Sequence, residues 1–151
     1  MNRFVFKLEP LYDYRQRLEE ASQREFSEAL MLLEEEERKL VELQKAYIKG
    51  CDDLDKLKEE GGQAEELGMY GAYFYGLKRH IAEQEKIIAG AREEFEARRA
   101  HLEESTKEKK VVETLKEKSY NTYIKELDKE EQKENDDLVS SRFKRSRDNE
   151  I

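Results

Sequence analysis

The residues that could support catalysis or hold a metal are few and far apart along this chain. His80 and His101 stand 21 positions apart, which is about 30 Å on one helix, too far to share a metal ion. Cys51 is the only cysteine, so we interpret it as a small residue beside a packed surface rather than half of a disulfide. The acidic run at positions 34–37 is typical of a solvated helix face. The sequence predicts no enzyme, no metal site and no cofactor, because no phosphate-binding loop, nucleophile elbow or Cys–His spacing occurs.

The composition favours long helices over an ordinary globule. Of the 151 residues, 44% are charged and 36% apolar, with one proline and no tryptophan. Such a chain is either disordered or a coiled coil with one narrow apolar stripe. The apolar residues recur periodically, which favours the coiled coil over disorder. The net charge of −8 excludes nucleic acid as the main partner, since phosphate binding needs a basic surface.

The sequence predicts a cytoplasmic protein. It has no apolar run near the roughly 20 residues that span a bilayer, and no signal segment. We therefore expect peripheral contact with the cytoplasmic side of the membrane only through partner proteins.

A glycine-rich stretch divides the chain. Gly61, Gly62 and Gly68 are three of its seven glycines, and each costs a helix interior about 1 kcal/mol. We predict one coiled-coil domain over 1–151, with helix one at 8–59, a bend at 60–69 and helix two at 70–139. The basic stretch 140–151 is predicted to be a disordered tail.

Apolar residues on both sides of the bend recur at steps of three and four, which is heptad spacing. The first seam is Leu8, Leu11, Arg15, Leu18, Ser22, Phe26, Ala29, Leu33, Glu36, Leu40, Leu43, Tyr47, Gly50, Leu54 and Leu57. The second is Phe74, Leu77, Ile81, Gln84, Ile88, Ala91, Phe95, Arg98, Leu102, Ser105, Lys109 and Val112, continued more loosely by Leu115, Ser119, Thr122 or Tyr123 and Leu127. A short link between two such helices predicts an all-α fold, a long antiparallel two-helix coiled coil (a helical hairpin).

Aromatic residues are in excess just after the bend. A two-helix seam uses Phe74 but has no need of Tyr73 and Tyr75. At 100° per residue Tyr73, Leu77, His80 and Gln84 form a stripe beside the seam. This stripe is a candidate protein contact, since tyrosine is enriched at binding hot spots. The alternative is that the rings wrap the turn and cover the neighbouring helix.

Three motifs resemble FliJ, the small coiled-coil component of the bacterial flagellar export apparatus. They are Phe4-x-Phe6-x-Leu8-x-x-Leu11-x-x-x-Arg15, then Tyr70-x-x-Tyr73-x-x-x-Leu77-x-x-x-Ile81-x-x-Gln84, and the ending Tyr123 to Asp137 with Glu126, Glu131-Gln132-Lys133 and Asp136. Their order and spacing cover nearly the whole chain. His80 stands where the family has a small residue.

The resemblance implies a non-catalytic protein of flagellum biogenesis, motility and chemotaxis. FliJ proteins are antiparallel two-helix coiled coils similar to the stalk (gamma) subunit of rotary ATPases. They bind the hexameric export ATPase, FliI, and the cytoplasmic domain of the export gate, FlhA, and some also handle export chaperones. The expected partners here are therefore an ATPase ring, an export gate and export chaperones of this type.

Residue by residue, the resemblance assigns two surfaces. The export-gate surface comprises Tyr73, Leu77, His80 and Gln84, with Leu40 and Leu43 of helix one. The ATPase-ring surface comprises Phe4, Phe6, Leu8 and Leu11 with the opposing Leu127, Glu131, Gln132 and Lys133.

Other functions stay open at this stage. The stalk protein of a virulence-type secretion system shares this pattern. A holdase chaperone would use the bend and its aromatic residues to shield apolar cargo. A self-associating structural coiled coil would bury the tyrosine stripe in a homodimer.

Overall fold

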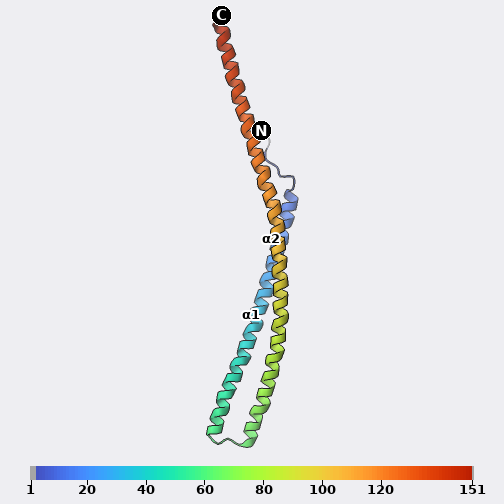
Figure 1. The fold of residues 1–151 in the computed structure, drawn as a ribbon, viewed down its shortest axis with the longest axis vertical. Helices are drawn as coiled ribbons and strands as arrows, with labels where there is room; N and C mark the ends of the chain where they lie inside the picture. The colour runs from blue at the N-terminus through green and yellow to red at the C-terminus, as the bar shows by residue number, and fades with distance from the viewer. Residues whose placement is uncertain (1–2, 151) are drawn as a thin grey trace. The chain divides into compact units, whose positions relative to one another are not determined.

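The computed structural model describes residues 3–150. Over this range the chain forms two α-helices and no strand. Helix α1 is Glu9–Glu59 and helix α2 is Ala64–Asn149, and a short turn joins them (Figure 1). The all-α helical hairpin predicted from the heptad spacing is confirmed.

Glycine makes the turn after α1 possible. Gly61 has a φ of 74°, a left-handed conformation that costs glycine nothing. The Gly62 N–H donates to the Leu57 carbonyl at 2.9 Å and the Gly61 N–H donates to the Lys58 carbonyl at 3.3 Å. This pair of bonds is a Schellman motif, which satisfies the last carbonyls of α1. A Cβ on Gly62 would lie 2.5 Å from Cγ of Leu57, so both glycines are needed.

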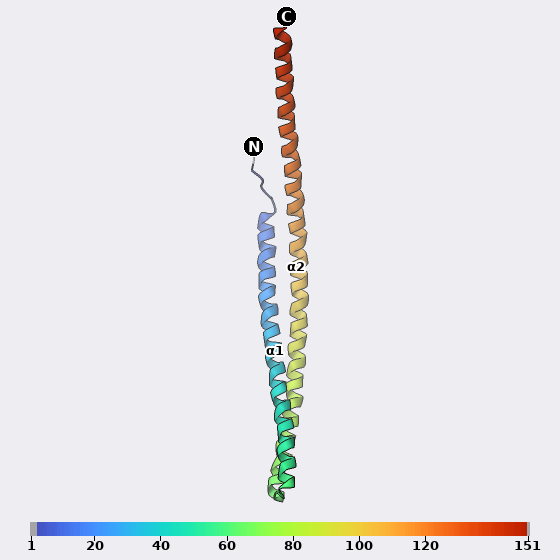
Figure 2. The same ribbon diagram turned by 90° about the vertical axis from the view of Figure 1, so that its left-hand side faces the viewer.

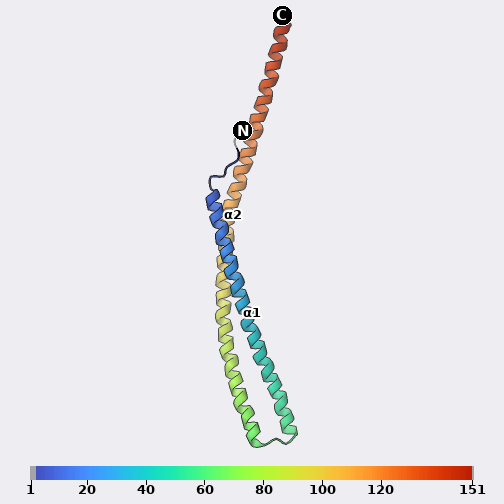
Figure 3. The same cartoon turned by 180° about the vertical axis from the view of Figure 1, so that it is seen from behind.

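The turn is shorter than predicted, because this motif reverses the chain within residues 60–63. The expected bend at 60–69 is wrong beyond residue 63: α2 begins at Ala64 and includes Gly68. Acidic side chains at Glu65 and Glu66 stabilise its first turn through the helix dipole. Figure 3 shows the two helices leaving this turn.

The basic stretch after residue 139 is helical. It was expected to be disordered, but α2 continues through it to Asn149. The stretch contains no glycine or proline to stop the helix, and arginine and lysine are good helix formers. Every side chain from 128 to 150 is exposed, so this part of α2 has no helical partner among the described residues.

The chain divides into two compact units. Of the described residues, unit 1 contains 3–18 and 105–150, and unit 2 contains 19–104. Each unit pairs part of α1 with part of α2.

The predicted seam forms the core of both units. In unit 2, Leu33, Ile88 and Ala91 form the buried cluster, with Leu40 and Phe95 packed against it. All buried residues in the described range except one lie at predicted seam positions: Ser22, Ala29, Leu33, Glu36, Gly50, Leu77, Gln84, Ile88, Ala91, Ser105 and Val112. The exception is Phe6, in the segment before α1.

That N-terminal segment packs on α2 within unit 1. Residues 3–8 precede the first turn of α1, and Figure 2 shows them beside α2. The Phe4 ring lies 5.3 Å from the Tyr120 ring and 5.4 Å from the Tyr123 ring, centroid to centroid. Aromatic contacts of this kind bury a large apolar area, so the segment is held against the helix before α1 begins.

Candidate interaction surfaces

The six residues predicted to bind the export gate do not share one exposed face. Tyr73 is 46% exposed and His80 is also exposed. Leu77 and Gln84 are buried in the seam of unit 2, while Leu40 and Leu43 are half-buried. Leu77 and Gln84 therefore follow the predicted seam, and the exposed stripe that was also predicted is wrong for these two residues. These two residues serve as core positions, because α1 approaches this face of α2 directly.

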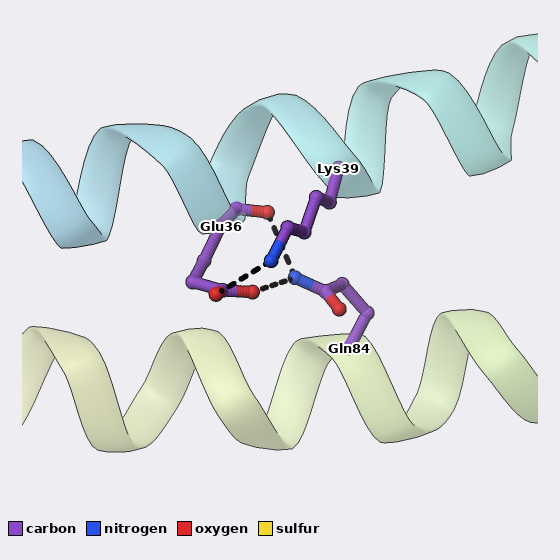
Figure 4. A network of polar contacts seen from close by, with 3 residues as sticks. All are labelled: Glu36, Lys39 and Gln84. Carbon is purple, nitrogen blue, oxygen red and sulfur yellow. Dashed lines mark hydrogen bonds and ion pairs between the residues drawn. The ribbon is translucent and has the colours of Figure 1, made fainter.

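Gln84 joins the two helices through a polar network. Its Nε2 donates to Oε2 of Glu36 at 2.6 Å and to the Glu36 carbonyl at 2.9 Å. The Nζ of Lys39 donates to the other carboxylate oxygen of Glu36 at 3.0 Å. Figure 4 shows the three side chains meeting between the helices. A buried carboxylate is costly unless paired, and this network supplies the donors that Glu36 needs.

The network changes the acidity of its members. The hydrogen bond from Gln84, with that from Lys39, holds the pKa of Glu36 below its ordinary value. The hydrogen bond to Glu36 in turn raises the pKa of Lys39. The ionised carboxylate is the form that these donors stabilise.

Glu36 should consequently contribute to acid sensitivity. Because its folded pKa lies below the unfolded value, its contribution is present above the unfolded pKa and is lost as the pH falls through the folded pKa. The variant Glu36→Gln should show a smaller loss of urea stability between roughly pH 5 and pH 2. Equilibrium urea unfolding followed by circular dichroism across this range measures the difference. Glu35→Gln, at the exposed neighbour, should follow the wild-type pH profile; identical profiles for all three proteins would contradict the assignment.

Near the turn, Phe74 is the centre of an aromatic cluster in unit 2. Its ring lies 5.2 Å from that of Tyr47, 6.1 Å from that of Tyr70 and 5.8 Å from that of Tyr73. Gly50 on α1 makes room for it, since a Cβ there would lie 2.9 Å from Cε1 of Phe74. The cluster is therefore part core and part surface, and Tyr73 stands on its exposed side.

A groove borders this cluster. It has a volume of about 560 Å³ and is lined by Ala46, Lys49, Gly50, Asp53, Met69, Tyr70 and Tyr73. Met69 is 69% exposed, and methionine adapts readily to a partner surface. The sequence-based site omitted Met69 and Tyr70, although their spacing of four and three from Tyr73 places all three on one helix face. Tyr75 is 73% exposed and does not line the groove.

The residues predicted to bind the ATPase ring belong to unit 1 and fall into two groups. Phe4 and Phe6 pack on α2, as described above. Leu8 and Leu11 are exposed and Leu127 is half-buried, whereas Glu131, Gln132 and Lys133 are fully exposed further along α2. Residues 3–8 face Ser119, Thr122, Tyr123 and Glu126 across a shallow groove. The fold thus brings the N-terminal segment to α2 near residue 123, before the exposed Glu131–Lys133 group.

Ion pairs align the helices in unit 1. Lys116 Nζ lies 2.9 Å from a carboxylate oxygen of Glu9 and 4.8 Å from the centre of the Tyr12 ring. The Glu9 hydrogen bond raises the pKa of Lys116. Arg15, a polar seam residue, pairs with Glu108 at 2.6 Å. The charged side chain at this seam position is thus paired with a carboxylate of the facing helix. The spacing of residues in the sequence does not reveal which carboxylate it is.

No cluster of three or more potential metal ligands occurs within residues 3–150. In the same range neither helix carries an apolar stretch long enough to cross a membrane.

Comparison with known proteins identifies the family. A family model described as the flagellar FliJ protein matches residues 4–148. The chain belongs to the FliJ family. Membership supports a role as a component of flagellar or type III protein export, in agreement with the resemblance of its three motifs.

A solved structure supports the fold of this FliJ-family chain. A Chlamydia trachomatis protein, CT670, described as a YscO homologue, matches with a TM-score of 0.52 and 21% identity over 91% of this chain and 94% of its own. At this identity the likeness concerns the fold. A search among curated proteins found no match.

Proposed function

We propose that this chain is a non-catalytic stalk and coupling protein of the flagellar type III export apparatus. It binds the hexameric export ATPase with unit 1 and the cytoplasmic domain of the export gate with unit 2. The observation that carries the proposal is the FliJ family match over residues 4–148. In this proposal the protein is cytoplasmic and reaches the membrane only through the gate, and it also handles export chaperones.

In this proposal the gate surface differs in part from the predicted stripe. Tyr73 and His80 remain from the predicted stripe, because their side chains are exposed. The groove adds Met69 and Tyr70. An apolar groove with an exposed tyrosine at its edge suits a partner helix or loop with an aliphatic side chain to bury. Leu77 and Gln84 support this surface from beneath.

The ATPase-ring surface lies at the exposed part of α2. Within residues 3–150, Glu131, Gln132 and Lys133 form no hydrogen bond or ion pair and are fully exposed, so they are free to meet the walls of a pore. Charged rims set the orientation and rate of association more than its strength. We therefore expect alanine at these three positions to affect ring binding without affecting helicity.

Stimulation of the ATPase tests this proposal. Adding the purified chain to its cognate ATPase should raise both the hexamer fraction and the rate of ATP hydrolysis. The variant Glu131→Ala/Gln132→Ala/Lys133→Ala should lose most of this stimulation, because without these polar groups the chain associates more slowly and in less well-defined orientations with the ring. Native mass measurement and phosphate release follow the two effects.

The matched control changes exposed charges in unit 2. Glu85→Ala/Lys86→Ala removes one acid and one base, as the triple variant does, and should stimulate the ATPase like the wild type. A wild-type chain without effect on either assembly or hydrolysis would contradict the stalk role. Equal loss in both variants would place the contact elsewhere.

A further inference from the structure

The end of α2 carries a charge pattern that is complementary to itself. After Leu127, the seam face of the helix continues through Glu131, Glu134, Leu138, Arg142 and Arg145. Their spacing of three, four, four and three keeps all five within about 40° of one line along an α-helix. The positions of the charged residues are symmetric about Leu138. The two acids precede it, and the two bases follow it at the same distances along the chain.

No described residue of unit 1 covers this face. Side chains 128–150 are all exposed, and Leu138 is 58% exposed. Within the part of the chain that the structure describes, the charged groups of Glu131, Glu134, Arg142 and Arg145 form no ion pair. The seam face of α2 is therefore partnered where α1 lies against it and unpartnered past Leu127.

We propose that this face pairs with the same face of a second copy, in antiparallel orientation. When Leu138 of one copy meets Leu138 of the other, Glu134 lies opposite Arg142 of the second copy. At the same time Glu131 lies opposite Arg145. The two-fold axis repeats both contacts, so four ion pairs flank one apolar contact in an isologous interface.

Charge complementarity selects this occupant and this orientation. A parallel pair would place Glu131 and Glu134 against their own copies and the arginines likewise, which repels. A different partner would need the reverse order of charges at the same spacing, and an antiparallel copy has it by symmetry. Exposed ion pairs stabilise only weakly, so the pairing is concentration-dependent and sensitive to salt.

Self-pairing does not depend on the proposed function, but the paired face overlaps the proposed ATPase-ring surface. The paired face includes Glu131 and begins beside Leu127, both of which belong to the proposed ATPase-ring surface. A paired chain therefore has this surface covered, and self-pairing competes with ring binding.

Sedimentation equilibrium of the full chain tests the pairing. At about 0.05 M sodium chloride the weight-average mass should rise above 18.0 kDa toward twice that value as the concentration increases from micromolar to submillimolar. At about 1 M salt the apparent Kd should rise at least about tenfold, because screening shortens to about 3 Å. A chain that stays monomeric throughout at low salt overturns the proposal.

Charge reversal identifies the face. Glu131→Arg/Glu134→Arg should be monomeric, and so should Arg142→Glu/Arg145→Glu, because each places like charges across the axis. A mixture of these two variants should form a one-to-one complex. A chain with all four changes should self-associate again, since the order is inverted but still symmetric.

The matched control lies on the opposite side of the same turns. Lys144→Glu/Arg147→Glu makes the same change in net charge as the second variant, and should associate like the wild type. If it loses association equally, net charge and not this face is responsible, and the proposal fails. Circular dichroism confirms that each variant keeps its helicity, as expected for exposed positions.

Discussion

Replacing Ile88 with alanine should lower the free energy of unfolding by about 2–3 kcal/mol. Ile88 is 6% exposed and forms the buried cluster of unit 2 with Leu33 and Ala91. Truncation removes apolar contacts and leaves a gap that the two helices cannot fully close. The expected loss lies toward the lower end for buried isoleucine, because a two-helix seam surrounds a side chain less completely than a globular core.

The adjacent residue offers a close control. Ile87 has the same side chain on the same helix but is 51% exposed. Both substitutions carry the same gain in helix propensity, so their difference reports burial in the seam. Ile87→Ala should change the free energy of unfolding by less than about 0.5 kcal/mol. Urea unfolding of both variants measures the difference, and equal destabilisation would show that α1 does not pack on Ile88.

Replacing Tyr73 with alanine should weaken binding to the cytoplasmic domain of the export gate by at least about 30-fold, the effect of losing one hot-spot tyrosine. Tyr73 lines the groove and presents part of its ring to solvent, next to the exposed Met69. Its loss removes apolar area from the centre of the proposed surface. Isothermal titration of the purified gate domain with each variant measures the affinity.

Tyr75→Ala is the matched control for this effect. Tyr75 is more exposed than Tyr73 but stands outside the groove, so its loss should leave gate affinity near that of the wild type. Both variants should keep their helicity and urea midpoint, apart from a small loss at Tyr73 through its contact with Phe74. If the two alanine variants bind the gate equally well, the groove is not the gate surface. If Tyr73→Ala unfolds unit 2, its ring is core.

Part of the candidate site was predictable, and part was not. Tyr73 could be identified because the sequence shows more aromatic residues after the bend than the heptad seam requires. The heptad spacing placed Leu77 and Gln84 in the seam, whereas the predicted stripe placed them beside it. Only the packing of α1 on α2 decided that both side chains are buried. Here Gly50 permits a close approach at Phe74, and Gln84 meets Glu36 from the other helix.

The amino-acid sequence by itself determined the helical hairpin and its seam. Steps of three and four between apolar residues, and a pair of glycines that permit a left-handed turn, act locally and need no distant partner. Tertiary structure alone decided which seam carboxylate is satisfied by which amide, and that Met69 borders a groove with residues of α1. Those features depend on the relative positions of two helices that are distant in sequence, and contacts between them form only when the helices pack.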